Sequence, residues 1–211
     1  MPWNNLVKWI IRYGDDEHPD IHKFKHFIEK YGLRGVPSPL HFACLVDNSS
    51  IVKILIDNGA DVNAMDSNNA TPLHWACCQG KYSTVKYLLK HGADTSLVDM
   101  NGNSVLMYAI EKGLVEIVKL LIEEYNMNVH TNNHNLQNSI DIAYEEEEIE
   151  VLKYFIKEEI IDENTYLINY GFINTSLDFV LQSFFKKLNK VDTQSITRQD
   201  EISRDLEGTR K

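Results

Sequence analysis

The chain has 211 residues, 43% of them hydrophobic, and a formal net charge of −10 at pH 7. This length and composition are sufficient for a packed core. The sequence contains no run of about 18 apolar residues, so we expect no transmembrane helix and no stable membrane insertion. Residues 111–190 hold 7 basic and 15 acidic side chains, so most of the charge is local and nucleic acid is an unfavourable partner. Only three cysteines occur, Cys44, Cys77 and Cys78, which indicates a reducing compartment, the cytoplasm or the nucleus.

Residues 1–35 predict a helical N-terminal cap. Apolar side chains recur there at helical spacing, before and after the break at His18-Pro19. An amphipathic helix lying on a membrane is the alternative, with Lys8 and Arg12 near lipid phosphates. Three histidines in this region, His18, His22 and His26, are spaced four apart, but no carboxylate or cysteine shares their phase and we expect no metal site.

From residue 38 onward a six-residue motif recurs every 33 or 34 residues. Its copies are Ser38–Ala43, Thr71–Ala76, Ser104–Ala109 and Asn138–Ala143. A second apolar block keeps the same period, at 52–56, 85–89, 118–122 and 152–156. Two helical blocks on one period predict a stack of helix pairs, in which no unit buries its apolar face alone.

Within one period the helix boundaries can be predicted from the second copy. Thr71 is placed to cap the first helix, and Pro72 occupies the first turn, where a missing N–H costs nothing. Gly80 ends that helix, 81–90 forms the second one, and Gly92 lies where a left-handed residue is expected.

The C-terminal part predicts a degenerate capping repeat at 162–189 and a disordered tail at 190–211. Thr175 and Asp178 form a plausible capping pair for a helix with an apolar stripe. The stripe consists of Leu177, Val180, Leu181, Phe184, Phe185 and Leu188. The tail holds few large apolar side chains.

The Thr-Pro-Leu-His-x-Ala start, the Val-x-x-Leu-Leu block and the Gly-Ala-Asp that follows resemble the ankyrin repeat. The resemblance implies an all-α solenoid of stacked helix-turn-helix units, with four repeats at 36–65, 66–98, 99–132 and 133–161. It also implies turns that project as fingers and form a concave groove for a protein or peptide. One repeat, with Trp75 and the run at 92–97, is similar to the ankyrin region of DHHC palmitoyltransferases, in which the Trp helps to hold extended peptides.

The phase of the repeat predicts the partner-binding residues. The position after the motif histidine carries a ladder of Phe42, Trp75, Tyr108 and Ile142. Packing between repeats is the alternative role for Phe42 and Ile142, whereas the ring of Trp75 is larger than the usual leucine and favours binding. Large, partly exposed aromatic residues are good binding anchors. The complete predicted set is Phe42, Leu45, Trp75, Cys78, Tyr108, Glu111, Lys112, Asn69, Asn101, Glu145 and Glu146.

Acidic side chains gather at Glu145 to Glu148, where the other repeats place Gly80 and Gly113. They favour a basic partner; the alternative is a charged run that only solvates a helix end. Asn63 is a candidate for asparaginyl hydroxylation, because Val62 precedes it and Leu55 lies eight residues before it, as the family resemblance requires.

These features together predict a monomeric, non-catalytic protein-interaction module without a cofactor. Lys outnumbers Arg 16 to 5, as in AT-rich genomes, so a bacterial effector acting in a host cytosol, a viral protein or a protist adaptor stays open. An inhibitor that blocks a partner's surface and an enzyme with its site in 163–211 are further alternatives.

Overall fold

The computed structural model describes residues 37–46, 49–162, 177 and 180–186. The predicted N-terminal cap, the Thr175–Asp178 capping pair and the predicted tail lie outside these residues. The contacts of the chain divide it into two compact units, Met1–Glu146 and Glu147–Lys211, and we describe each by itself.

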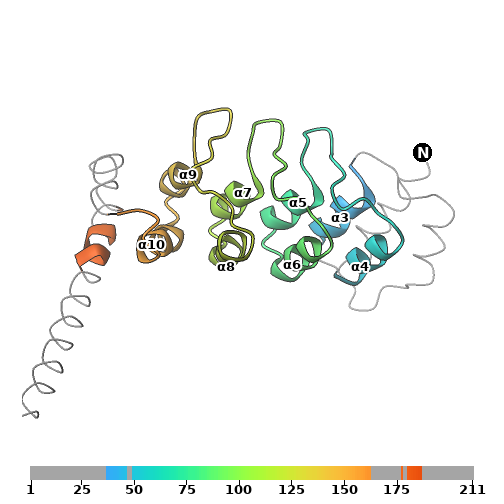
Figure 1. Cartoon of the computed structure of the whole chain (residues 1–211), viewed down its shortest axis with the longest axis horizontal. Coiled ribbons are helices and arrows are strands. Elements are labelled where there is room, and N and C mark those ends of the chain that lie inside the picture. The colour runs from blue at the N-terminus through green and yellow to red at the C-terminus, as the bar shows by residue number, and fades with distance from the viewer. Residues whose placement is uncertain (1–36, 47–48, 163–176, 178–179, 187–211) are drawn as a thin grey trace, which may run out of the picture. The chain divides into compact units, whose positions relative to one another are not determined.

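The first unit is a stack of helix pairs (Figure 1). The first helices of the pairs are α3 (Pro39–Leu45), α5 (Pro72–Cys78), α7 (Val105–Glu111) and α9 (Ser139–Glu145). The second helices are α4 (Ser49–Asp57), α6 (Tyr82–Lys90) and α8 (Val115–Lys119), which continues as the π-helical segment η1 (Leu120–Glu124). Each first helix packs on the next first helix along the row, and each second helix packs on its own first helix.

The core of this stack repeats along with the sequence. The motif leucines Leu40, Leu73 and Leu106 are buried in α3, α5 and α7. An alanine three residues further on is fully buried in every first helix of the stack, which allows neighbouring backbones to approach closely. No pair could bury these positions alone, so the stability of the stack depends on contacts between neighbouring pairs.

Two buried histidines link the start of one helix pair to the loop of the next. In α5 the backbone N–H of Thr71 donates to His74 Nδ1 over 3.1 Å, which leaves the proton on Nε2. That Nε2–H donates to the Asn103 carbonyl over 3.3 Å, and His41 makes the corresponding bond to the Ala70 carbonyl over 3.0 Å. Burial lowers the pKa of both imidazoles, which keeps them neutral.

The change of period from 33 to 34 residues falls at the end of the third pair. In the second pair, Ala93 N–H donates to the Leu88 carbonyl, five residues back; in the third, Met127 N–H donates to Leu121, six residues back. The extra residue is absorbed where α8 turns into η1, since a π-helical turn holds one more residue than an α-helical turn. Asn126 then takes the left-handed conformation that Gly92 has in the second pair, with φ of 52° and 88° respectively.

The second unit contains α10 (Ile149–Lys157) and a helical stretch at 180–186. Leu177, Leu181 and Phe185 are buried, as expected for a stripe at helical spacing. Val180 belongs to the predicted apolar stripe but is 37% exposed, because it lies one residue away from the line of the other three.

No helix in the part of the chain that the structure describes is long and apolar enough to cross a membrane.

Candidate partner-binding groove

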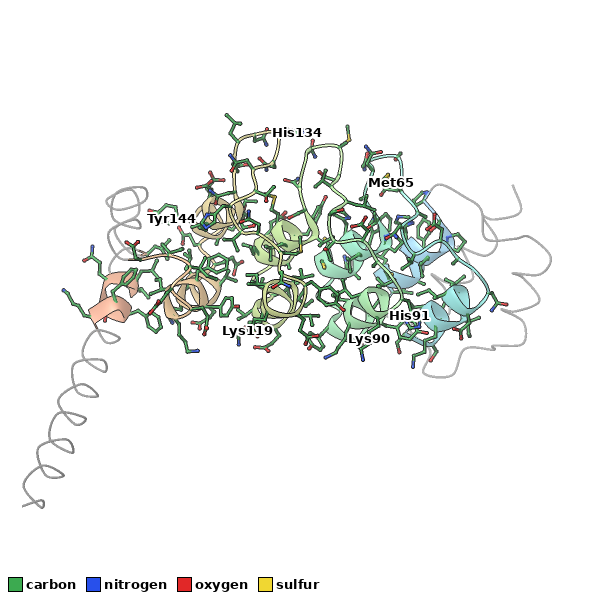
Figure 2. All side chains as sticks on the ribbon, viewed as in Figure 1. Met65, Lys90, His91, Lys119, His134 and Tyr144 are labelled. Carbon is green, nitrogen blue, oxygen red and sulfur yellow. The ribbon has the colours of Figure 1, made fainter. Side chains whose placement is uncertain are left out.

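Three loops project beside the first helices, at 64–70, 97–103 and 131–137, and we call them fingers 1, 2 and 3 (Figure 1). Met65 and His134 lie on this side of the first unit, and Lys90, His91 and Lys119 lie on the side of the second helices (Figure 2). Neighbouring fingers are joined by backbone hydrogen bonds, from Met100 N–H to the Asn68 carbonyl and from His134 N–H to the Asn101 carbonyl. The fingers and the first helices together form the surface that we call the groove.

A buried aspartate shapes each of the first two fingers. Asp66 is 8% exposed, and its Oδ1 accepts the backbone N–H groups of Asn68 and Ala70 over 2.7 and 2.9 Å. Asp99 does the same in finger 2 with Asn101 and Asn103. A carboxylate that accepts two backbone N–H groups closes the finger without a regular strand.

The second oxygen of each aspartate holds the aromatic residue nine positions further along the chain. Trp75 Nε1–H donates to Asp66 Oδ2 over 3.0 Å, and the Tyr108 hydroxyl donates to Asp99 Oδ2 over 3.0 Å. The polar groups of both rings are therefore engaged by the finger. Burial, and then the bond to Asp99, raise the pKa of the Tyr108 hydroxyl.

Finger 3 has a different arrangement because the ladder position of α9 carries no aromatic donor. The ladder residue is Ile142, and an asparagine, Asn133, replaces the aspartate. Asn133 Oδ1 still accepts two backbone N–H groups, and its amide donates instead to Asn103 Oδ1 over 2.8 Å. The Asn133 amide thus joins fingers 2 and 3, and Ile142 has no ring donor that would need an acceptor there.

An apolar pocket of about 290 Å³ opens between Trp75 and Tyr108, and we call it the aromatic pocket. Its lining comes from α3, finger 1, α5 and α7. The residues are Leu45, Asp66, Asn68, Ala70, His74, Trp75, Cys78, Gln79 and Tyr108. Since the ring donors are bonded to aspartates, the pocket offers a ligand the apolar parts of the rings and a thiol rather than the Trp75 N–H.

A smaller pocket of about 160 Å³ lies one repeat further along, and we call it the acidic pocket. Its lining is mostly polar and includes Glu111 at the end of α7 and Glu145 and Glu146 at the end of α9. Gln137 of finger 3 donates to Glu145 over 2.6 Å. Tyr108 lines both pockets, so they are adjacent.

The charge of the acidic pocket acts on the lysine at its edge. Lys112 Nζ lies 2.7 Å from Glu111 Oε1, and Glu111 raises the pKa of this ammonium group, with a smaller contribution from Glu146. Both partners are exposed, so this pair contributes little to stability. One lysine beside three glutamates leaves the acidic pocket with a negative balance.

Some of the predicted partner-binding residues line one or both pockets, and the others line neither. Leu45, Trp75, Cys78 and Tyr108 line the aromatic pocket, and Tyr108, Glu111, Glu145 and Glu146 line the acidic pocket. Phe42, Lys112, Asn69 and Asn101 line neither of them.

Phe42 and Asn69 have clear local roles outside the pockets. The Phe42 ring packs edge-on against Trp75 with centroids 5.7 Å apart, so it supports the wall of the aromatic pocket from behind. Asn69 holds the left-handed position of finger 1 with φ of 59°, where Gly102 stands in finger 2.

Several pocket residues were not predicted from the sequence, among them Asp66, Asn68, Asn135 and Gln137. The sequence does contain a signal for Asp66. In fingers 1 and 2 an aspartate lies nine residues before the aromatic ladder residue that donates to it. Leu136, at the tip of finger 3, was also missed; it is 79% exposed and has a φ of 63°. It holds in finger 3 the left-handed position that Asn69 and Gly102 hold in fingers 1 and 2.

Asn63, the modification candidate, joins two neighbouring repeats. Its amide donates to the Gly92 carbonyl over 3.0 Å, and its Oδ1 accepts the Asp94 N–H over 2.8 Å. Its side chain is therefore engaged at both ends.

The three cysteines differ in their environment. Cys44 and Cys77 are fully buried, and desolvation raises the pKa of both thiols. Cys78 is half-buried and faces the aromatic pocket, so it is the accessible thiol of the three. Among the described residues, no group of three or more His, Cys, Asp or Glu side chains could hold a metal ion.

The repeated helix pairs, fingers and motif bonds define a repeat protein built to present a surface. The family model for "Ankyrin repeats (3 copies)" matches residues 3–99 and 91–166, which is more than half of the chain. The chain belongs to the ankyrin-repeat family and is a protein–protein interaction module. No curated protein matches the chain, and the likeness of one repeat to DHHC palmitoyltransferases is not confirmed.

Proposed function

We propose that the groove captures an extended segment of a partner protein, with one apolar side chain of that segment held between Trp75 and Tyr108. The aromatic pocket between these two rings carries the proposal. Its volume of about 290 Å³ is at the lower limit of clefts that hold whole small molecules, roughly 300–1,000 Å³, and suits a single side chain.

The fixed position of the rings supports a binding role. The bonds to Asp66 and Asp99 hold Trp75 and Tyr108 in place before any ligand arrives. Little side-chain entropy remains to be lost on binding, and rigid aromatic walls are common binding hot spots.

We also propose that the partner is basic near its binding segment. Glu111, Glu145 and Glu146 place negative charge at one end of the groove. Such a field speeds the association of a basic partner and repels nucleic acid, and both effects weaken as salt increases.

The groove can be tested by selecting peptides from a random display library on the wild-type chain. The selected peptides are then measured against Gln79→Trp and Ser83→Trp. Gln79 is exposed and lines the aromatic pocket, whereas Ser83 is exposed on α6 and lines neither pocket. Both variants add the same ring to the surface, but only the first one fills the pocket.

We expect Gln79→Trp to abolish binding and Ser83→Trp to keep it, with circular dichroism showing that both variants are folded. Selected peptides that bind Gln79→Trp as tightly as the wild type would show that the pocket is not the site.

A further inference from the structure

We propose that the captured segment is a polyproline II helix that carries an apolar residue in the aromatic pocket and an arginine or lysine, three positions away, in the acidic pocket. This inference rests on the proposed function of the groove and adds the conformation and side-chain spacing of the ligand.

The spacing follows from the repeat. The two pockets share Tyr108 and lie one repeat apart, because one is built on α5 and α7 and the other on α7 and α9. Packed helices lie about 8–10 Å apart. Two side chains of one ligand must therefore point into the groove from positions separated by about that distance.

The polyproline II helix meets this requirement. It has three residues per turn with a rise of about 3.1 Å, so residues i and i+3 lie on one face about 9 Å apart. A regular strand places i and i+2 on one face at only about 6.6 Å, and puts i+3 on the opposite face. An α-helix advances only about 4.5 Å over three residues.

The aromatic pocket has the chemistry for the apolar residue. Its lining includes the rings of Trp75 and Tyr108 together with Leu45 and Cys78. Proline-rich segments dock on aromatic-lined surfaces of this kind. The backbone of such a segment makes no internal hydrogen bonds, and the exposed amides of Asn68 and Gln79 stand beside it as donors for its carbonyls.

The acidic pocket complements a basic residue. Glu111, Glu145 and Glu146 surround a space of about 160 Å³, and the amide side chains of fingers 2 and 3 supply further acceptors. A guanidinium group has five donors and no acceptor, which suits this set. Lys112, at the edge, is bound to Glu111 and exposed, so it can turn outward when a ligand cation enters.

The test uses fluorescein-labelled peptides on a proline scaffold, with leucine and arginine separated by two prolines in both chain directions. Matched peptides separate the same two residues by one or by three prolines. Another replaces arginine with citrulline, which keeps the shape and removes the charge. We expect the i, i+3 arrangement in one direction to bind at least about tenfold more tightly than the other spacings and the citrulline peptide, because charged hydrogen bonds have that magnitude.

The protein side has its own controls. A Glu145→Gln, Glu146→Gln variant should weaken the arginine peptide about tenfold and leave the citrulline peptide unchanged. Glu116→Gln removes an exposed carboxylate on α8, outside both pockets, and should change neither affinity. Bound peptide should also slow the alkylation of Cys78 by iodoacetamide.

The outcomes separate the two proposals. Peptides that protect Cys78 but bind alike at every spacing, or alike with citrulline, would overturn the two-pocket rule and leave the groove as the site. Absence of binding by every scaffold peptide would overturn the rule as well. Display-selected peptides that bind the wild type but not Gln79→Trp would still support the proposed function. If those peptides also ignore Gln79→Trp, both proposals fail.

Discussion

Removal of the Tyr108 hydroxyl tests how firmly a finger is held by its aspartate. Tyr108→Phe keeps the ring and deletes the 3.0 Å bond to Asp99, which is 4% exposed. A hydrogen bond to a charged group contributes about 1.5–3 kcal/mol. Because Tyr108 is half-buried, water can partly replace it, so we expect a loss near the lower limit, about 1.5 kcal/mol. With an m-value of about 1–3 kcal/mol/M, the urea midpoint should fall by about 0.5–1.5 M.

The assay is urea unfolding followed by circular dichroism, with Tyr82→Phe as the matched control. Tyr82 is exposed on α6, and its ring stays in place beneath Lys86 when the hydroxyl is removed. We expect the control to change the free energy of unfolding by less than about 0.5 kcal/mol. Equal losses in the two variants would refute the idea that the bond to Asp99 stabilises finger 2.

Two further predictions concern the backbone and the buried imidazoles. Gly102→Ala should destabilise the protein by about 1–2 kcal/mol more than Gly92→Ala in urea unfolding, because both glycines have positive φ but only at Gly102 would the new Cβ lie 2.9 Å from the His134 nitrogen; equal losses would contradict this. Stability should fall as pH decreases below 6.5, because burial lowers the pKa of His41 and His74 and the unfolded chain then binds more protons. Unfolding free energies between pH 7.5 and 5 should show a shallower slope when both are replaced by glutamine, and an unchanged slope would exclude these groups as the cause.

The helix pairs could be predicted from the sequence because the same pattern of apolar and capping residues occurs in each repeat. Thr71, Pro72 and Gly80 mark the ends of one helix. Ser38 and Pro39 repeat the start a period earlier, and Ser104 and Gly113 repeat the cap and the end a period later. The left-handed position of Gly92 is confirmed, with φ of 88°. Agreement among several degraded copies makes a boundary more certain than any single copy does.

The groove could be predicted only in part, because its pockets depend on contacts between residues of different roles. The ladder position predicted Trp75 and Tyr108, which line the aromatic pocket. Phe42 stands at the same ladder position, yet it packs edge-on against Trp75 and lines neither pocket. Repeat phase places a residue on a face, but contacts with its neighbours decide whether it lines a pocket.

The acidic pocket needed more than the charge pattern. The glutamate run predicted Glu145 and Glu146, yet the pocket also requires finger 3, where Asn133 and Gln137 build its wall. Amide side chains carry no charge and no periodic apolar signal. Neither the composition nor the phase of the repeat therefore predicts that they line a pocket. Their roles follow from the folded structure, in which Gln137 of finger 3 donates to Glu145.

The pairing of Asp66 with Trp75 links the stability of the groove to its binding role. The edge of the Trp75 ring holds finger 1 through Nε1, and the same ring forms a wall of the aromatic pocket. Trp75→Ala would therefore remove a wall and release a finger together, and a loss of binding could not be assigned to either. Gln79 lines the same pocket from an exposed position, with no ring or finger depending on it. A large side chain at that position blocks the ligand and leaves the scaffold intact, so its effect on binding reports on the pocket alone.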